Sequence, residues 1–168
     1  MNTEELENIL RLHKMWLNGN ENGVRANLSY ANLGGSDLRD ADLSYANLNY
    51  VNLSEANLSY ANLSSANLSY ANLSSANLSD ADLGGSDLSG ADLSYANLSS
   101  ANLSYADLYM TTWPLWCGSK NARIDISIAS QLAAHFCCLR CDDPEYQKAK
   151  EALLPLAKKF KYAGDLGL

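Results

Sequence analysis

Long apolar runs, basic residues and histidine are scarce in this sequence of 168 residues, and each scarcity excludes a class of protein. No apolar run approaches the roughly 18 residues that a membrane-spanning helix needs, so we expect no membrane association. Lys and Arg number 12 against 19 Asp and Glu, for a net charge of -7, and this balance opposes direct nucleic-acid binding. The first residues carry Glu4, Glu5 and Glu7 instead of a signal peptide, which predicts a cytoplasmic protein.

Residues that could carry chemistry are equally few. The four cysteines all lie in the last third of the chain (Cys117, Cys137, Cys138 and Cys141). Three of them share one expected helix with His135, a spacing unlike that of structural zinc sites, so free thiols are favoured over a metal. His13 is the only other histidine, and no phosphate-binding motif is present. We therefore expect no enzyme, no metal and no cofactor.

The abundant feature is one short repeat. Leucine occurs at every fifth position from Leu28 to Leu108, so residues 26–110 form seventeen pentapeptides of the pattern A-[N/D]-L-S-x. The position two before leucine is alanine except at Ser36, Val51 and Ser86. The seventeen leucines are the expected core ladder: Leu28, Leu33, Leu38, Leu43, Leu48, Leu53, Leu58, Leu63, Leu68, Leu73, Leu78, Leu83, Leu88, Leu93, Leu98, Leu103 and Leu108.

A period of five fits neither a helix nor a strand, because steps of five scatter the leucines around a helix and alternate them across a strand. The chain must therefore turn once in each repeat. Alanine and leucine, two residues apart, point to the same side of a short extended segment, and the Ser-x pair is left for the corner. Four such sides close a square, which predicts a β-solenoid of parallel ladders with about four coils.

Residues 26–110 thus resemble the pentapeptide-repeat family. The resemblance implies a right-handed quadrilateral parallel β-helix with leucine and the preceding alanine inside. Several repeats are nearly verbatim copies, and the block 34–48 recurs at 84–98 with two differences. This regularity suggests recent duplication or, as we favour, a synthetic consensus design joined to natural-like helical ends.

The flanking segments predict three parts: 1–25, 26–110 and 111–168. Residues 3–18 should form an N-terminal capping helix, with Thr3 as N-cap and Gly19 as stop. Its apolar stripe should lie on the first coil, and His13 on that stripe is given a structural role.

The segment 111–168 should form a C-terminal helical cap. Trp113 and Trp116 are candidates to close the open end of the coils. One helix is expected over roughly 126–140, with Asp125 as N-cap. A second should begin at Asp143-Pro144 and run toward Phe160, with a kink or division at Pro155.

Two functions remain open. The first is a scaffold or protein-interaction module without a ligand of its own, with a possible homodimer through the C-terminal cap. The alternative, implied by the family resemblance, is a DNA mimic that binds a type II topoisomerase such as DNA gyrase. Nine acids and one base lie in the repeats, but they are spread evenly over the four sides. Tyr30, Tyr50 and Tyr70, one coil apart, form a candidate interaction surface.

Overall fold

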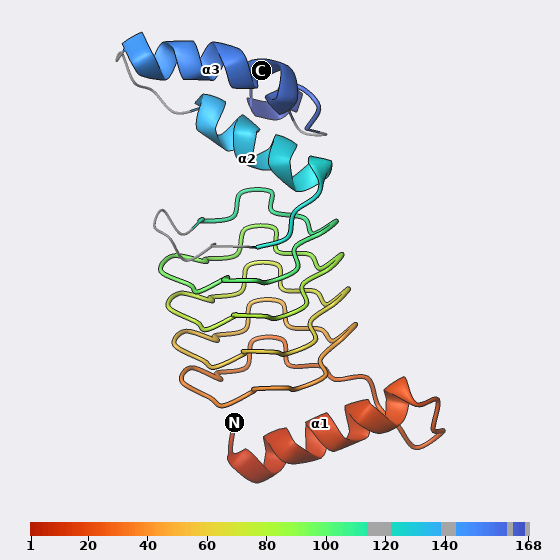
Figure 1. Cartoon of the computed structure of the whole chain (residues 1–168). Helices are drawn as coiled ribbons and strands as arrows, with labels where there is room; N and C mark the ends of the chain where they lie inside the picture. Colours follow the sequence, from red (N-terminus) through yellow and green to blue (C-terminus); the bar gives the residue numbers. More distant parts are fainter. Residues whose placement is uncertain (114–121, 139–143, 161–162, 167–168) are drawn as a thin grey trace. The chain divides into compact units, whose positions relative to one another are not determined.

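The computed structural model describes residues 1–113, 122–138, 144–160 and 163–166. These form two compact units, Met1–Arg123 and Ile124–Leu168. The first contains helix α1 (Thr3–Leu17) and a stack of square turns (Figure 1), and the second contains α2 (Ile126–Cys138), α3 (Pro144–Ala157) and the 3-10 turn η2 (Ala163–Leu166). Within these ranges no helix combines the length and the apolarity needed to cross a bilayer.

Parallel β-bridges one residue wide join successive turns of the stack. Four columns of bridges begin at Asn27, Asn32, Asp37 and Asp42, and each residue pairs with the one twenty positions later. The Asn102–Arg123 bridge spans one residue more. Four sides of five residues therefore make one turn, as the period of the sequence predicts.

The inside of the stack is filled by the repeat leucines and alanines. Each of the seventeen leucines is at most 4% exposed. The alanines two positions earlier are also buried from the second turn onward. In the first turn Ala31, Ser36 and Ala41 are only half-buried, because no turn lies beneath them.

Each corner is a tight turn that begins at the leucine. In the first repeat the Ala31 N–H donates to the Leu28 carbonyl over 3.1 Å, and Tyr30 between them has φ 60°. A positive φ at the third residue alone is the mark of a type II turn. The Asn27 carboxamide oxygen accepts from both the N–H and the hydroxyl of Ser29, at 3.2 and 2.8 Å. The pattern N/D-L-S therefore forms a local turn, in which the side chain of the first residue accepts hydrogen bonds from the third residue.

Helix α1 begins one residue earlier than its predicted cap implied. The Glu5 N–H donates to the side chain of Asn2 over 2.8 Å, which makes Asn2 the N-cap and Thr3 the first helical residue. The prediction of Thr3 was wrong because Asn2, an equally good capping residue, precedes it. At the other end Asn18 is the C-cap, and Gly19 follows with φ 72°.

In the second unit, the predicted helix cap is confirmed, but the predicted effect of Pro155 is not observed. The Ile128 N–H donates to the Asp125 carboxylate over 3.0 Å, so the predicted cap of α2 is confirmed. Pro155 lies inside α3 near its end, where the helix continues to Ala157 instead of dividing. Phe160 follows the helix and is buried. Trp116, Cys117 and Cys141 lie outside the described residues.

Candidate interaction surfaces

The acidic side chains of the repeats fall into two groups with different surroundings. Six occupy the position before leucine, where each carboxylate accepts the N–H of the residue two positions later: Asp37, Asp42, Asp82, Asp87, Asp92 and Asp107. These six make the same turn bond that asparagine makes elsewhere. The other three, Asp40, Glu55 and Asp80, stand at corner positions with positive φ.

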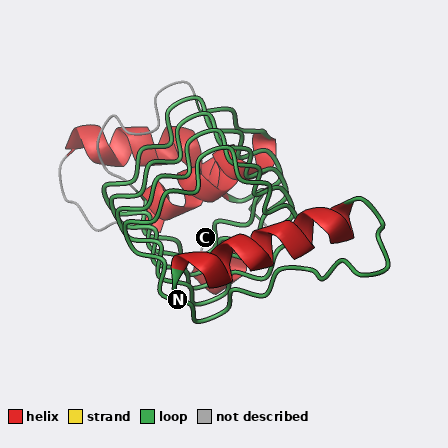
Figure 2. Ribbon diagram, turned by 90° about the horizontal axis from the view of Figure 1, so that it is seen from below, coloured by secondary structure: helices red, strands yellow, loops and turns green. Residues whose placement is uncertain are grey.

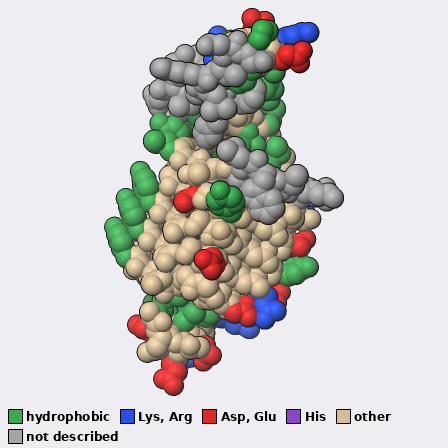
Figure 3. All heavy atoms as spheres, turned by 90° about the vertical axis from the view of Figure 1, so that its left-hand side faces the viewer, with side chains coloured by type: hydrophobic (Ala, Val, Ile, Leu, Met, Phe, Trp, Pro, Cys, Tyr) green, Lys and Arg blue, Asp and Glu red, His purple; other side chains and the backbone are tan. Residues whose placement is uncertain are grey.

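The acids do not gather into a stripe. On the face in Figure 3 the acidic side chains over the coils are scattered, some among uncharged groups and some beside basic side chains. Asp37 also pairs with Arg39, whose Nε and Nη2 donate to its two carboxylate oxygens at 2.8 and 2.6 Å. These bonds lower the pKa of Asp37 and neutralise part of the local charge.

Tyr30, Tyr50 and Tyr70 form a stack of parallel rings up one edge of the coils. The ring centroids are 5.0 and 4.9 Å apart, with planes inclined by 2° and 9°. Above Tyr70 the same corner position is Gly90, where a Cβ atom would meet the Tyr70 ring at 2.7 Å. The Tyr70 ring thus lies across Gly90. The three stacked rings form an ordered surface of the first unit.

Gly90→Ala should cost more stability than Gly85→Ala, although the two glycines have nearly equal φ of 68° and 67°. Both substitutions place a Cβ in the left-handed region, at about 1 kcal/mol. Only Gly90→Ala displaces the Tyr70 ring, since the closest atom to a Cβ at Gly85 is 3.6 Å away. We expect an additional loss of about 0.5–1.5 kcal/mol in urea unfolding; equal losses would mean that the ring does not pack there.

His13 joins α1 to the first turn of the stack. The Ala26 N–H donates to His13 Nδ1 over 3.1 Å, and Nε2 lies 3.1 Å from the Ser44 carbonyl. Because Nδ1 accepts, Nε2 carries the proton and donates. The ring stacks on Trp16 at 5.6 Å and is fully buried. Burial is the main cause that lowers the pKa of His13, so the imidazole is neutral and both its nitrogens are satisfied.

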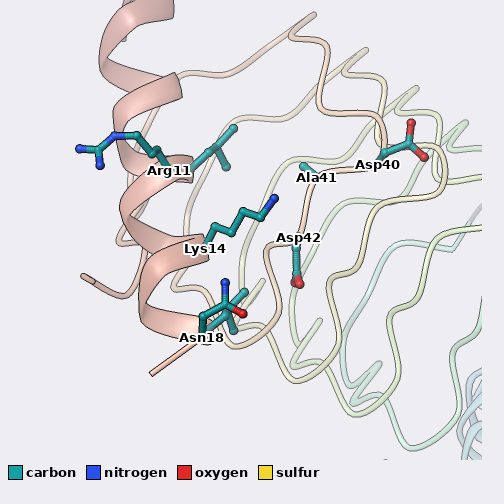
Figure 4. A pocket seen from close by; sticks show the side chains of 8 residues that line it. Arg11, Lys14, Asn18, Asp40, Ala41 and Asp42 are labelled. Carbon is teal, nitrogen blue, oxygen red and sulfur yellow. The ribbon is translucent and has the colours of Figure 1, made fainter. Parts of the chain in front are cut away.

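A groove of about 470 Å³ lies between α1 and the turn that contains Asp40 and Asp42. Figure 4 shows Lys14 extending from the helix toward this turn, while Arg11 points away. Arg11 instead donates to Asn8 and to Met15 on its own helix. Within the described chain Lys14 forms no ion pair with either aspartate. The opposite charges of Lys14 and the two aspartates favour the packing of α1 against this turn. Nothing in this arrangement of side chains suggests catalysis. No signal in the sequence predicted this groove.

Of the candidate metal-binding side chains, only that of Cys137 belongs to the described residues. Those residues hold no group of three or more His, Cys, Asp or Glu side chains placed to bind a metal ion. Cys137 is buried, and its thiol lies 3.8 Å from the Lys150 carbonyl, which accepts from it. The side chains of His135 and Cys138 are outside the described residues.

Comparison with family models finds pentapeptide repeats over residues 24–59, 46–85, 56–94 and 81–112, in eight copies. Together these segments cover more than half of the chain. Comparison with curated proteins gives no match.

Several solved structures are similar to the chain. Rfr23, a pentapeptide repeat protein from the cyanobacterium Cyanothece 51142, is 39% identical over 60% of this chain, with a TM-score of 0.37. The chain spans 58% of that protein's length. The pentapeptide repeat protein alr5209 from Nostoc Pcc 7120 is 30% identical, with 68% of this chain and 93% of that one covered and a TM-score of 0.36. QnrB1, a plasmid-mediated fluoroquinolone resistance protein, is 21% identical over 65% of this chain and 64% of its own, with a TM-score of 0.28.

Proposed function

The chain belongs to the pentapeptide-repeat family, whose members fold as right-handed quadrilateral β-helices, and on this premise we propose that it is a non-enzymatic scaffold or protein-interaction module. The proposal rests mainly on the observation that most acidic side chains of the repeats form hydrogen bonds within the fold. Six of the nine repeat carboxylates accept backbone N–H bonds within their own turns. They occupy positions where asparagine serves equally well, so their placement follows from turn formation rather than from recognition of a partner.

The proposal includes the organisation of the chain. Residues 1–25 act as an N-terminal cap, 26–110 as a β-helix of about four coils, and 111–168 as a C-terminal helical cap. His13 supports the first assignment, since it bonds α1 to both Ala26 and Ser44. The cytoplasm is the proposed compartment. The near-verbatim repeats support an origin by consensus design or duplication.

Homodimerisation through the C-terminal cap is a separate part of the proposal. It rests on the apolar residues of the tail, such as the exposed Ile126, which exceed what a small cap needs. Light scattering at high protein concentration should give twice the monomer mass. A strict monomer would contradict it.

The alternative function is a DNA mimic that binds a type II topoisomerase such as DNA gyrase. It is supported by the net charge of -7 and opposed by the even spread of the acids. A DNA duplex presents one charge per roughly 1.7 Å of axis, so a mimic should carry dense stripes of outward carboxylates. Only Asp40, Glu55 and Asp80 among the repeat acids stand at corner positions, and they come from two of the four sides.

A gyrase supercoiling assay titrated with this protein separates the two functions. The scaffold proposal predicts no inhibition up to concentrations well above that of the enzyme. Inhibition at low micromolar protein, abolished by the triple substitution Asp40→Asn, Glu55→Gln and Asp80→Asn, would establish the mimic instead. The same triple variant should keep the fold, because none of the three side chains forms a turn bond.

A further inference from the structure

The stack of tyrosine rings is closed at its upper end and open at its lower end. Tyr70 at the upper end lies across Gly90. Among the described residues, Tyr30 at the lower end stacks on a single ring, that of Tyr50, and it is 72% exposed against 47% for Tyr50 in the middle. One face of the Tyr30 ring is therefore free at the base of the stack, where the next ring of the series would lie.

A groove of about 410 Å³ lies beside this ring. It is lined by Tyr30 and its neighbours Asn27, Ser29 and Asn32 on the first turn, and by Glu5 and Ile9 of α1 among others. Its size suits a small planar ligand. Figure 2, which views the molecule from below, shows α1 running along one side of the stack's base. The groove is lined by residues of α1 and of the first turn, so it lies at this end of the coils.

The base of the first turn presents unpaired backbone groups of both kinds: the N–H groups of Asn27 and Asn32 donate to no described residue, and carbonyl acceptors lie beside them. In the turn above, the carbonyls of Asn47 and Asn49 point down and accept from Leu28 and Tyr30 at 2.8 and 3.1 Å. The corresponding carbonyls of Asn27 and Ser29 point the same way, below the first turn, and accept no bond from any described residue. Glu5 adds a carboxylate to the lining, and Met1 adds the ammonium group of the chain's N-terminus.

We propose that this groove, named here the Tyr30 site, binds a small planar heteroaromatic cation that carries N–H donors. Its ring would stack on the free face of Tyr30 and continue the series of the three tyrosines. Its charge would be attracted by the negative face of the ring and by Glu5. Its N–H groups would donate to the free carbonyls of Asn27 and Ser29. The proposal names a ligand class for the interaction module and rests on that proposed function.

The test uses proflavine, a planar three-ring cation with amino groups, titrated into the full chain and followed by its absorbance and fluorescence. We expect one saturable site per chain. Tyr30→Ser should weaken binding at least fivefold, and Glu5→Gln should weaken it by a smaller factor. The uncharged planar molecule acridone should bind several-fold more weakly than proflavine.

Tyr95→Ser is the matched control, because Tyr95 is also 72% exposed and occupies a corner position without a stacked partner in the described chain. Serine already stands at such corners, for example at Ser65 and Ser75, so both variants should fold, as circular dichroism would verify. An unchanged affinity in Tyr30→Ser, or an equal loss in Tyr95→Ser, would overturn the proposal. So would several weak sites that salt abolishes, since these would indicate general attraction to an acidic surface. The gyrase assay does not depend on this binding experiment. If proflavine does not bind at the Tyr30 site, the scaffold proposal is still tested separately by the gyrase assay.

Discussion

Replacing Leu68 by alanine is expected to lower the free energy of unfolding by about 3–5 kcal/mol. Leu68 is fully buried in the middle of the stack, with leucines directly above and below it in the turns of Leu88 and Leu48. Its replacement by alanine leaves a cavity that the backbone cannot readily close, because hydrogen bonds to the turns above and below fix the position of this side of the square. Urea unfolding followed by circular dichroism measures the loss.

Ser75→Ala provides the control for this substitution. Ser75 is an exposed corner residue in a neighbouring repeat, and its replacement should change stability by less than about 0.5 kcal/mol. In a repeat protein each turn contacts only its neighbours, so the Leu68→Ala defect should also make unfolding less cooperative. A Leu68→Ala protein as stable as the Ser75→Ala protein would contradict the packing of the leucine ladder.

Replacing His13 by alanine should cost about 3 kcal/mol, because it leaves two buried backbone groups without partners. These are the Ala26 N–H and the Ser44 carbonyl, which His13 bridges. The stacking contact with Trp16 is lost as well. Glu7→Ala, on the exposed face of the same helix, should have little effect. Equal stability of the two variants in urea would show that His13 does not hold α1 to the stack.

The same histidine predicts a pH dependence of stability. The pKa of His13 in the folded protein is lowered by burial, while the Ser44 bond and Asp42 raise it to a smaller extent and Arg25 lowers it. The unfolded chain therefore binds a proton at higher pH than the folded one. This contribution to stability is complete above the ordinary histidine pKa of about 6.5 and declines as the pH falls below it.

The difference in unfolding free energy between the unsubstituted chain and His13→Ala isolates this contribution from that of His135. The difference should be constant at mildly alkaline pH and shrink as the pH falls below about 6.5. A difference that grows as the pH falls would mean that the folded state favours the protonated imidazole, contrary to the bonds observed.

The sequence predicted most of the solenoid because one repeat carries all the information for one side. Leucine at every fifth position implies a turn in each repeat, and a square of four sides implies the twenty-residue spacing found between Asn27 and Asn47. Asparagine or aspartate before leucine was visible as a pattern. Its reason, the bond from the Ser29 N–H to the Asn27 side chain, needed the turn geometry.

Other features depended on contacts between distant residues and could not be predicted. The left-handed conformation at Tyr30, Tyr50 and other non-glycine corners contradicts their ordinary preference, and it arises because the closing square leaves the turn no alternative. A structural role for His13 was expected, but its partner Ser44, thirty-one residues away, was not. The groove beside Tyr30 exists only because α1 crosses the base of the first turn.

The fold depends most on the twenty-residue register of the hydrogen bonds between successive turns, and residue-resolved amide hydrogen exchange tests this register. The Asn52 and Asn57 amides each donate over 2.9 Å, to the carbonyls of Ala31 and Ser36. They should be strongly protected. The corresponding amides of the first turn, Asn32 and Asp37, donate to no described residue and should exchange at rates close to those of an unfolded chain. Rapid exchange at Asn52 and Asn57, or equal protection in the two turns, would contradict the twenty-residue stack with an open first edge.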